Sequence, residues 1–525
     1  MQAESAVLSP AQRALSRLPP HLRRFAVDQR HGDYTPRDHA VWRHVLRRLV
    51  RHLAEKAHPS YLAGLEAVGI GTERIPSLDE MNARLVRLGW SAVCVRGFIP
   101  PAVFTELQSL RVLAIAADVR THEHVEYTPA PDIVHESAGH APILADPAYA
   151  AYLQKVGELG FRAIASAEDA EVYEAIRHLS VVKEDPEATP EEVARAEQRL
   201  ADSGSARRIT SESTRASRLY WWTAEYGLVG SLDRPRIYGA GLLSSIGEST
   251  HCLSDAVERV RLSLDCVEQD YDITTMQPRL FVARDFDELS ELAARMAETL
   301  SWRRGGDHGL EVARSARSVT CLSLDGGLEV SGVVYERFGG ARPLAPGLET
   351  AAAVVGGPSL LSRNGRALEG PWSLPAVVAF GTLKLPREGR FRVELESGLV
   401  LDGRALRGRE VAELRGRVQG REIALPPRAL LVGSRSLPSV SGGPADPETW
   451  DSHFGRPAAE GEGEARARAR KAAALPPGLG RLYAEVREMR ERGAPDRARL
   501  SAIAAELSSF PDDWLLREEI RELGE

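Results

Sequence analysis

The chain of 525 residues has only four cysteines, which lie far apart and form no Cys-x-x-Cys pair. A disulfide framework and a thiolate zinc cluster are therefore not expected, and a reducing compartment is the default. The sequence also lacks any run of 18 apolar residues, which argues against a transmembrane helix. Its first twenty residues contain no apolar stretch typical of a secretion signal. We therefore expect a cytoplasmic location.

An excess of positive charge is absent as well. The chain has 67 Lys and Arg against 74 Asp and Glu, a formal net charge of −7. This balance argues against non-specific binding to nucleic acid or to an anionic membrane. The remaining composition, 43% hydrophobic and 27% charged, is that of an ordinary globular protein. The length suggests roughly three domains.

Periodicity divides the chain into helical and β-rich parts. Thr35 followed by Pro36 and Asp38 predicts a helix start, and apolar residues at three- and four-residue spacing follow it. We predict that the opposite face of this helix, with Arg43 and Arg47, is solvated. Two stretches after residue 318, SVTCLSLDGGLEVSGVVYERF and FRVELESGLVLDG, have the alternation of β-hairpins. No internal repeat is present in the sequence.

These patterns predict a mainly α domain with small β elements, followed by a β-rich module and a short helical tail. The predicted limits are an N-terminal tail at 1–17, the mainly α domain at 18–305 with a charged insertion at about 183–214, the β-rich module at 306–436, a linker at 437–474, and a helical segment at 475–525.

Two histidines five residues apart are the first candidates for chemistry. His135 and His140 have Glu136 beside the first of them, whereas zinc peptidases place two histidines four apart on one helical face. Five residues correspond to about 140° around an α-helix, so both imidazoles can meet one ion only if the helix ends between them. Gly139 and Pro142 favour such an ending. The spacing alone leaves metal binding and ordinary surface or core histidines both open.

A carboxylate inside an aromatic run is the second candidate. Glu225 lies in Tyr220-Trp221-Trp222-Thr223-Ala224-Glu225-Tyr226, where its burial is costly unless it is paired or ligated. Arg215 or Arg218 could be an ion-pair partner, so both interpretations stay open. Two histidines and one carboxylate form the facial triad that leaves open positions on Fe(II), although zinc would accept the same atoms.

Four stretches, in this order, resemble the signatures of the tetrahydropterin-dependent aromatic amino acid hydroxylases. They are PDIVHESAGHAPILADPAYAAY, YWWTAEYGLVG, IYGAGLLSSIGE and YDITTMQPRLFVARDFDEL. The resemblance covers about Leu18 to Arg303 and is greatest to the longer bacterial phenylalanine 4-monooxygenases. It implies a mainly α catalytic domain that uses Fe(II), O₂ and a tetrahydropterin to hydroxylate phenylalanine to tyrosine. Hydroxylation of tryptophan or tyrosine is the near alternative.

The resemblance also implies a role for individual residues, with no catalytic residue beyond the metal ligands. The implied iron ligands are His135, His140 and Glu225. The implied substrate contacts are Arg120, which would hold the substrate carboxylate, and Tyr127, Thr128, Pro131, Trp221, Ser244 and Ser245. The implied pterin contacts are Ile99, Phe104, Glu136 and Tyr220. For Phe104, a core position on an amphipathic helix is the alternative. The sequence departs from the family at Ala114, where a histidine is expected, and at Pro101, where a serine is expected.

Two other classes of function remain as alternatives. One is a zinc-dependent hydrolase that uses the same histidines, and Gly139 in place of a second helical histidine speaks against it. The other is a binding or scaffold protein in which the β-rich module is the working part. The expected partners are an aromatic amino acid, O₂ and a reduced pterin, without nucleic acid or membrane. We hypothesise that the region after the α domain mediates oligomerisation or regulation.

Overall fold

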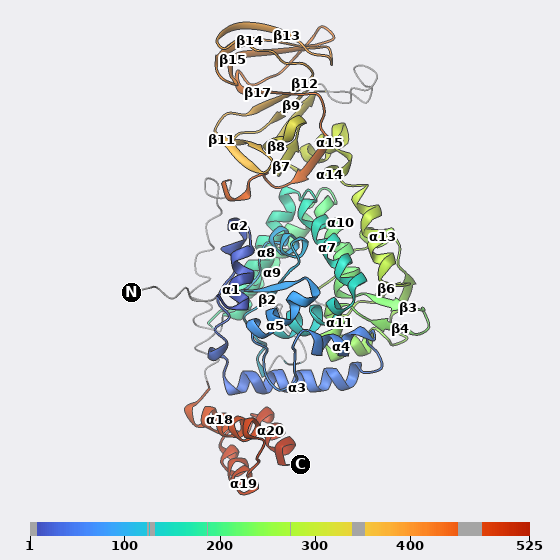
Figure 1. Ribbon diagram of the computed structural model, residues 1–525, viewed down its shortest axis with the longest axis vertical. Helices are drawn as coiled ribbons and strands as arrows, with labels where there is room; N and C mark the ends of the chain where they lie inside the picture. Colours follow the sequence, from blue (N-terminus) through green and yellow to red (C-terminus); the bar gives the residue numbers. More distant parts are fainter. Residues whose placement is uncertain are drawn as a thin grey trace.

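The computed structural model describes residues 8–122, 125, 132–185, 187–273, 275–338, 352–449 and 475–524. A central helical unit lies between a β-sheet at one end of the molecule and the C-terminal helices at the other (Figure 1). Among these residues, no helix is both long enough and apolar enough to cross a bilayer.

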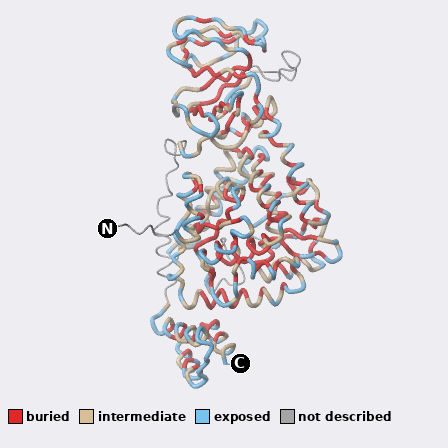
Figure 2. Tube along the Cα trace, viewed as in Figure 1, coloured by how far each residue is buried: buried red, intermediate tan, exposed pale blue. Residues whose placement is uncertain are grey.

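The central unit consists of helices around two small sheets. Its α-helices are α1 (Pro10–Arg17), α2 (Pro20–Arg23), α3 (Pro36–Leu53), α4 (Ser60–Ala67), α5 (Leu78–Leu85), α6 (Pro101–Ser109), α7 (Pro147–Arg162), α8 (Ala167–Glu184), α9 (Pro190–Ser205), α10 (Glu212–Tyr220), α11 (Ala240–Leu243), α12 (Ile246–His251) and α13 (Phe286–Ala297). Its other helical turns are η1 (His31–Asp33), η2 (Val86–Leu88), η4 (Val134–His140), η5 (Pro142–Ala145), η6 (Trp221–Glu225) and η7 (Leu264–Glu268). Buried positions follow the inward faces of these elements (Figure 2).

Of the two small sheets, the parallel pair lines part of the cavity described below. Strands β1 (Ser91–Val95) and β2 (Val112–Ala116) form a parallel pair. A four-stranded sheet has the order β4-β3-β6-β5. Its strands are β3 (Leu228–Gly230), β4 (Pro235–Ile237), β5 (Glu258–Arg261) and β6 (Arg279–Ala283).

Helix α3 begins where the sequence predicts. Thr35 Oγ1 accepts a hydrogen bond from the Asp38 N–H at 3.2 Å, and the Asp38 carboxylate accepts one from the Thr35 N–H at 2.7 Å. This capping box satisfies two amides that would otherwise lack a partner. The predicted apolar stripe is buried, with Trp42, Leu49 and Leu53 at 0% exposure. Burial of each such side chain contributes about 1.5–3 kcal/mol.

Most of the charged insertion predicted at about 183–214 lies in a helical hairpin, and its last residues begin α10. Helices α8 and α9 pack against each other, joined by a short connection. Along α9, Ala196 is the one buried residue, so this helix is largely exposed. Residue 183 lies in the last turn of α8, so the hairpin begins well before the predicted start of the insertion.

The β-rich part forms one sheet. Its strands are β7 (Val319–Ser323), β8 (Leu328–Phe338), β9 (Ala352–Val355), β10 (Ser359–Arg363), β11 (Arg366–Trp372), β12 (Ala376–Phe380), β13 (Gly389–Glu394), β14 (Leu399–Arg407), β15 (Glu410–Val418), β16 (Arg421–Ile423), β17 (Arg428–Ser434) and β18 (Ser439–Gly442). The main path is β11-β10-β8-β9-β12-β17-β15-β14-β13, with β7 between β8 and β18. Both predicted hairpins are confirmed, β7–β8 through the turn η8 (Asp325–Gly327) and β13–β14.

Two predicted boundaries are wrong. Residues 10–17, predicted as part of a tail, form α1, which packs on α5 and β1 with Ala14 buried. The segment predicted as a linker from residue 437 instead contains β18, which pairs with β7. It also packs against α14 (Ser301–Arg304) and α15 (Gly306–Ala316). Gly305 permits this approach, since a Cβ there would lie 2.2 Å from the carbonyl oxygen of Leu437. The other domain limits stay predictions.

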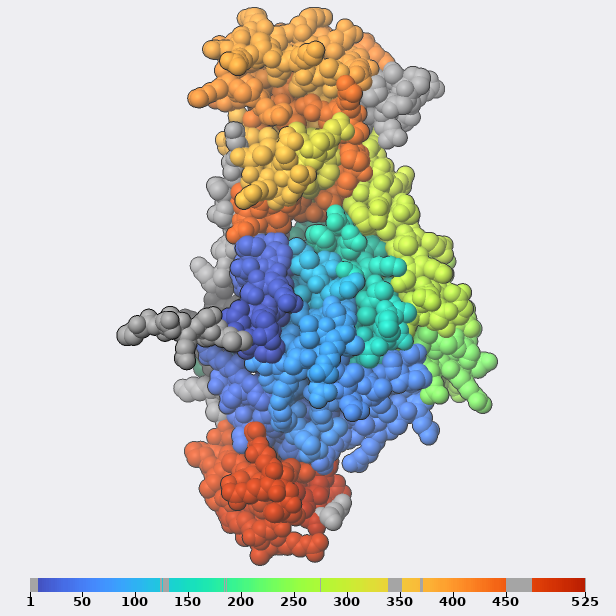
Figure 3. Space-filling view, in the orientation of Figure 1, coloured from blue at the N-terminus to red at the C-terminus, as the bar shows by residue number. Residues whose placement is uncertain are grey.

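The C-terminal segment forms α18 (Pro477–Arg492), α19 (Arg497–Glu506) and α20 (Trp514–Gly524), with η9 (Leu507–Ser509) between the last two. Helices α18 and α20 lie against α3, at the end of the molecule away from the sheet (Figure 3), and α19 packs on α20. Arg43 is thereby 3% exposed and pairs with Glu519, and Arg47 pairs with Glu522 at 2.6 Å. The prediction of a solvated arginine face on α3 is therefore wrong at Arg43.

Candidate metal centre and active-site cavity

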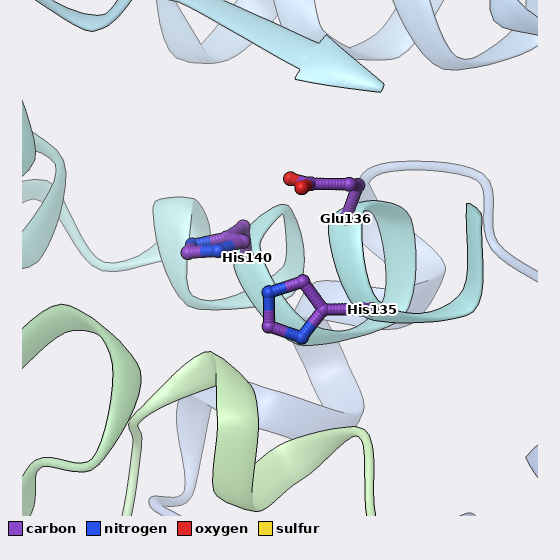
Figure 4. Close-up of side chains that lie close together, drawn as sticks. All are labelled: His135, Glu136 and His140. Carbon is purple, nitrogen blue, oxygen red and sulfur yellow. The ribbon is translucent and has the colours of Figure 1, made fainter. Parts of the chain in front are cut away.

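His135 and His140 lie on one continuous π-helix, η4. The expectation that a helix must end between them is therefore wrong. In a π-helix the backbone hydrogen bonds join residue i to residue i+5, so the side chains of residues five apart lie near the same face of the helix. Their ring centroids are 5.1 Å apart, and Glu136 projects from the same helix (Figure 4). Gly139 lets α11 approach, because a Cβ there would lie 2.7 Å from the carbonyl oxygen of Ala240.

Glu225 ends a second π-helix, η6, and faces both histidines. Its Oε2 lies 3.4 Å from Nε2 of His135, and its Oε1 lies 3.1 Å from Nε2 of His140. The arginines considered as alternative partners point elsewhere. Arg215 pairs with Glu268, and Arg218 with Asp270. The histidines, and not these arginines, are therefore the partners of the Glu225 carboxylate.

The three side chains fit a metal ion. Two ligand atoms that each lie about 2.1 Å from one ion, at right angles to each other, are about 3.0 Å apart. The two nitrogen–oxygen distances to Glu225 are close to this value. The His140 ring is 1% exposed, and Nε2 faces Glu225 without the alignment of a hydrogen bond. Two imidazoles and one carboxylate in this arrangement match the facial triad of non-haem iron sites.

Charge distinguishes Glu225 from its neighbour Glu136. Burial opposes ionisation of Glu225, but the nearby His140 and His135 outweigh it and bring its pKa to about 2. Burial raises the pKa of Glu136 to about 8, and His140 opposes this only in part. Both glutamates lie close to the histidine nitrogens. Because a metal ligand must be deprotonated, Glu225 is the better third ligand.

Ser244 orients the ring of His135. Its hydroxyl donates to the carbonyl oxygen of Ala240 at 2.8 Å, so its oxygen accepts from Nδ1 of His135 at 3.0 Å. His135 then carries its proton on Nδ1 and presents the lone pair of Nε2 toward Glu225. The predicted place of Ser244 in the amino acid pocket is compatible with this contact, since Ser244 also lines the cavity.

The cavity beside these residues has a volume of about 430 Å³. Most predicted site residues that the structure describes line it, while His140 lies against His135 and Glu225. The predicted residues that line the cavity are Ile99, Phe104, Arg120, His135, Glu136, Tyr220, Trp221, Glu225, Ser244 and Ser245. The remaining three, Tyr127, Thr128 and Pro131, lie outside the described residues.

Arg120 reaches the cavity but is held by a residue that the sequence analysis missed. Asp132 accepts from Nε of Arg120 at 2.8 Å and from Nη2 at 2.9 Å, and both side chains are buried. The carboxylate also accepts from the backbone N–H of His135 at 3.0 Å. Asp132 thus fixes the arginine relative to the histidine helix. Its place three residues before His135 was the one available signal in the sequence.

An aromatic stack forms one wall of the cavity. Trp221 stacks on Tyr226, at a centroid distance of 4.5 Å, and on Tyr271, at 4.3 Å. Tyr226 and Tyr271 were not predicted as site residues, although both lie in the quoted signature stretches. Flat apolar faces of this kind suit a planar ring in the ligand.

The sequence model of one family, described as biopterin-dependent aromatic amino acid hydroxylase, matches residues 23–184 and 197–305. These stretches are just over half of the chain. The chain belongs to this family. The interval between them, residues 185–196, falls in the α8–α9 hairpin, and residues 306–525 lie outside the match.

Curated relatives of this hydroxylase include two bacterial enzymes. The phenylalanine-4-hydroxylase of Pseudomonas aeruginosa is 31% identical over 262 residues, covering 50% of this chain and 83% of that protein. The phenylalanine-4-hydroxylase of Chromobacterium violaceum is 28% identical over 293 residues, covering 54% of this chain and 84% of that protein. A solved structure of the Chromobacterium enzyme, with iron(III) and 7,8-dihydrobiopterin, shares 28% identity. That comparison covers 56% of this chain and 94% of the other, with a TM-score of 0.42.

Two positions at which the sequence was expected to depart from the family lie at the cavity. Pro101 and Ala114, which replace an expected serine and histidine, both line it. Phe104 also lines it and packs edge-to-face on Tyr220 at 5.7 Å, while contacting a small hydrophobic cluster around Leu107. The cavity and core interpretations of Phe104 are therefore compatible.

Proposed function

We propose that the chain hydroxylates phenylalanine to tyrosine with O₂ and a tetrahydropterin at an iron(II) centre. The proposed ligands are His135, His140 and Glu225. The observation that carries the proposal is the approach of two Nε2 atoms to one carboxylate beside the aromatic-walled cavity. The relatives named phenylalanine-4-hydroxylases support phenylalanine as the substrate.

Iron(II) and the reduced pterin together supply the electrons that activate O₂, which amino acid side chains do not supply. The protein positions the reactants and excludes water. Ser244 holds the proton of His135 on Nδ1, and Asp132 holds the Arg120 guanidinium at the cavity. Arg120 is proposed to bind the substrate carboxylate, and Trp221 to contact the aromatic ring.

The proposed pterin contacts are Ile99, Phe104, Glu136 and Tyr220. All four line the same cavity as Arg120 and Trp221, which supports the delivery of pterin and amino acid to one place. The proposed substrate contacts further include Ser245, together with Tyr127, Thr128 and Pro131 from the family pattern. A zinc-dependent hydrolase is not favoured, since the family is described as biopterin-dependent. Tryptophan or tyrosine as the preferred substrate is the remaining alternative.

An aerobic assay of the iron(II)-loaded protein with tetrahydropterin and each of phenylalanine, tryptophan and tyrosine tests the proposal. Hydroxylated product and oxidised pterin are measured together. Tyrosine formed from phenylalanine in step with pterin oxidation supports it. Coupled product from another amino acid changes the substrate, and iron-loaded protein that oxidises no pterin contradicts the proposal.

We further propose that the β-rich module and the C-terminal helices serve regulation or oligomerisation, and that the enzyme works in the cytoplasm. The four cysteines are unpaired thiols and buried, consistent with a reducing compartment. Light scattering of the full-length chain over a hundredfold range of concentration tests oligomerisation. A constant monomer mass would contradict it.

A further inference from the structure

Glu248 is a cavity carboxylate for which the preceding sections give no role. Among the described residues, the cavity is lined by one guanidinium, Arg120, and by the carboxyl groups of Glu136, Glu225 and Glu248. Glu225 faces the histidines, and Glu136 is a proposed pterin contact. Glu248 comes from another element, α12, and lies beyond Ser244 and Ser245.

The local structure does not account for the orientation of this side chain. Ser245 and Glu248 have the spacing of a capping box, in which the glutamate would return to the Ser245 N–H. Only half of the box is present in α12, where Ser245 Oγ accepts from the Glu248 N–H at 3.2 Å. In α3, by comparison, both halves of the box are formed by Thr35 and Asp38. The Glu248 carboxylate therefore contributes to the cavity rather than to its own helix end.

The surroundings of Glu248 provide a hydrogen bond but no positive charge. The Tyr226 hydroxyl donates to Oε1 of Glu248 at 3.3 Å, and its ring stacks on Trp221. Within the described part of the chain, no cation acts on the Glu248 carboxylate. Burial raises its pKa, with the Tyr226 hydrogen bond opposing this. A partly desolvated carboxylate of this kind is stabilised by a cation brought by a ligand.

A chain of contacts connects Glu248 to Arg120 around the cavity. Asp132 holds the Arg120 guanidinium and accepts from the His135 backbone. His135 contacts Ser244 at 3.0 Å, and Ser245 next to it begins the helix that carries Glu248. The cavity is thus lined by both a guanidinium and a carboxylate, carried by elements that contact one another through His135 and Ser244.

We propose that Glu248 binds the α-ammonium group of the amino acid substrate whose carboxylate is bound by Arg120. This rests on the proposed function, because an α-amino acid carries both charges at neutral pH. With both charges paired, the side-chain ring extends toward Trp221. Glu248 thereby selects free amino acids over aromatic acids that lack the amine.

The test compares the binding of L-phenylalanine and 3-phenylpropanoate to the iron-loaded enzyme by calorimetry. The two ligands share ring and carboxylate and differ in the ammonium group. A charge-assisted hydrogen bond corresponds to roughly a 10- to 100-fold preference of the wild type for phenylalanine. In Glu248→Gln, Kd for phenylalanine should rise by about this factor, while Kd for 3-phenylpropanoate should change by less than about threefold.

A control variant and the ligand preference of the wild type distinguish the possible outcomes. Tyr226→Phe removes the hydroxyl donor but leaves the carboxylate, so it should keep the preference for phenylalanine. A Glu248→Gln enzyme with the wild-type preference overturns the inference alone. Wild-type enzyme that binds 3-phenylpropanoate as tightly as phenylalanine also overturns it, whatever the variant does. Wild-type enzyme that binds and hydroxylates neither phenylalanine nor another aromatic amino acid overturns the proposed function as well.

Discussion

Replacing Glu519 with glutamine would remove the charge that joins the C-terminal helices to α3. Its carboxylate accepts from Nε and Nη2 of Arg43 at 3.1 and 2.8 Å, and from Nε of Arg490 at 2.9 Å. The Arg43 and Glu519 side chains are 4% and 5% exposed. Removing one member of a buried ion pair leaves the other charge uncompensated.

The expected loss is about 3 kcal/mol, at the lower end of the range for a broken buried pair. The lower end applies because Arg43 keeps its hydrogen bond to the carbonyl oxygen of Glu73 at 2.7 Å. Such a loss corresponds to about a hundredfold increase in the opening of the docked helices. Hydrogen exchange of α20 and of α3, followed by mass spectrometry, measures this opening directly.

Two further variants separate burial from charge. Glu491→Gln breaks an exposed i,i+4 pair with Arg487 and should change exchange by less than about threefold. Changing both Arg43 and Glu519 to methionine should restore part of the protection, because a buried pair can be replaced by apolar side chains while Arg490 keeps its pair with Glu522 at 3.2 Å. A Glu519→Gln enzyme that exchanges no faster than the Glu491→Gln control would refute the reasoning.

Three other predictions follow from the central unit. His135→Ala should lower the affinity for iron(II) by more than about 100-fold, because losing a ligand costs more than losing a residue that only hydrogen-bonds to one. The variant should have no turnover, and its circular dichroism spectrum should be unchanged. Gly139→Ala should destabilise the protein by about 1–3 kcal/mol in urea unfolding, because its Cβ meets α11. His39 is buried, and burial followed by the charge of Arg487 lowers its pKa to about 3. The unfolded chain therefore binds the extra proton below about pH 6.5, so stability should fall as the pH drops from 6.5 toward 3, by up to about 1.4 kcal/mol per unit. Urea unfolding at pH 7 and pH 5 should show a smaller loss in His39→Gln, and an equal loss would contradict this assignment.

Local signals in the sequence predicted much of the fold. The start of α3 depends on Thr35 and Asp38, which are three residues apart, and the hairpin β7–β8 depends on alternation across one turn. Such features are encoded within a few residues, so a single sequence reveals them. The C-terminal helices were likewise predicted from their own periodicity.

Contacts between distant segments could not be predicted in this way. Arg43 and Glu519 are 476 residues apart, and nothing near either one distinguishes a buried pair from two solvated charges. The pairing of β18 with β7 has the same cause, since a short strand in a Pro- and Gly-rich stretch looks like a linker until its partner is known. Glu248 was missed for a different reason. Its spacing from Ser245 has a sufficient local explanation as a capping box, and only the orientation of the side chain shows that the explanation fails.

The spacing of His135 and His140 shows how a correct observation led to a wrong structural expectation. On an α-helix, a separation of five residues points the second imidazole away from the first. Binding of both imidazoles to one ion would therefore require a helix end between them. The chain instead widens the helix to i→i+5 bonding, and it does so again where Glu225 is placed. π-helical segments are rare and concentrate at functional sites. They are less stable than an α-helix, so they persist mainly where function requires side chains to point in a particular direction. Two of them converging on one set of ligand atoms is therefore an argument for metal binding that is independent of family membership.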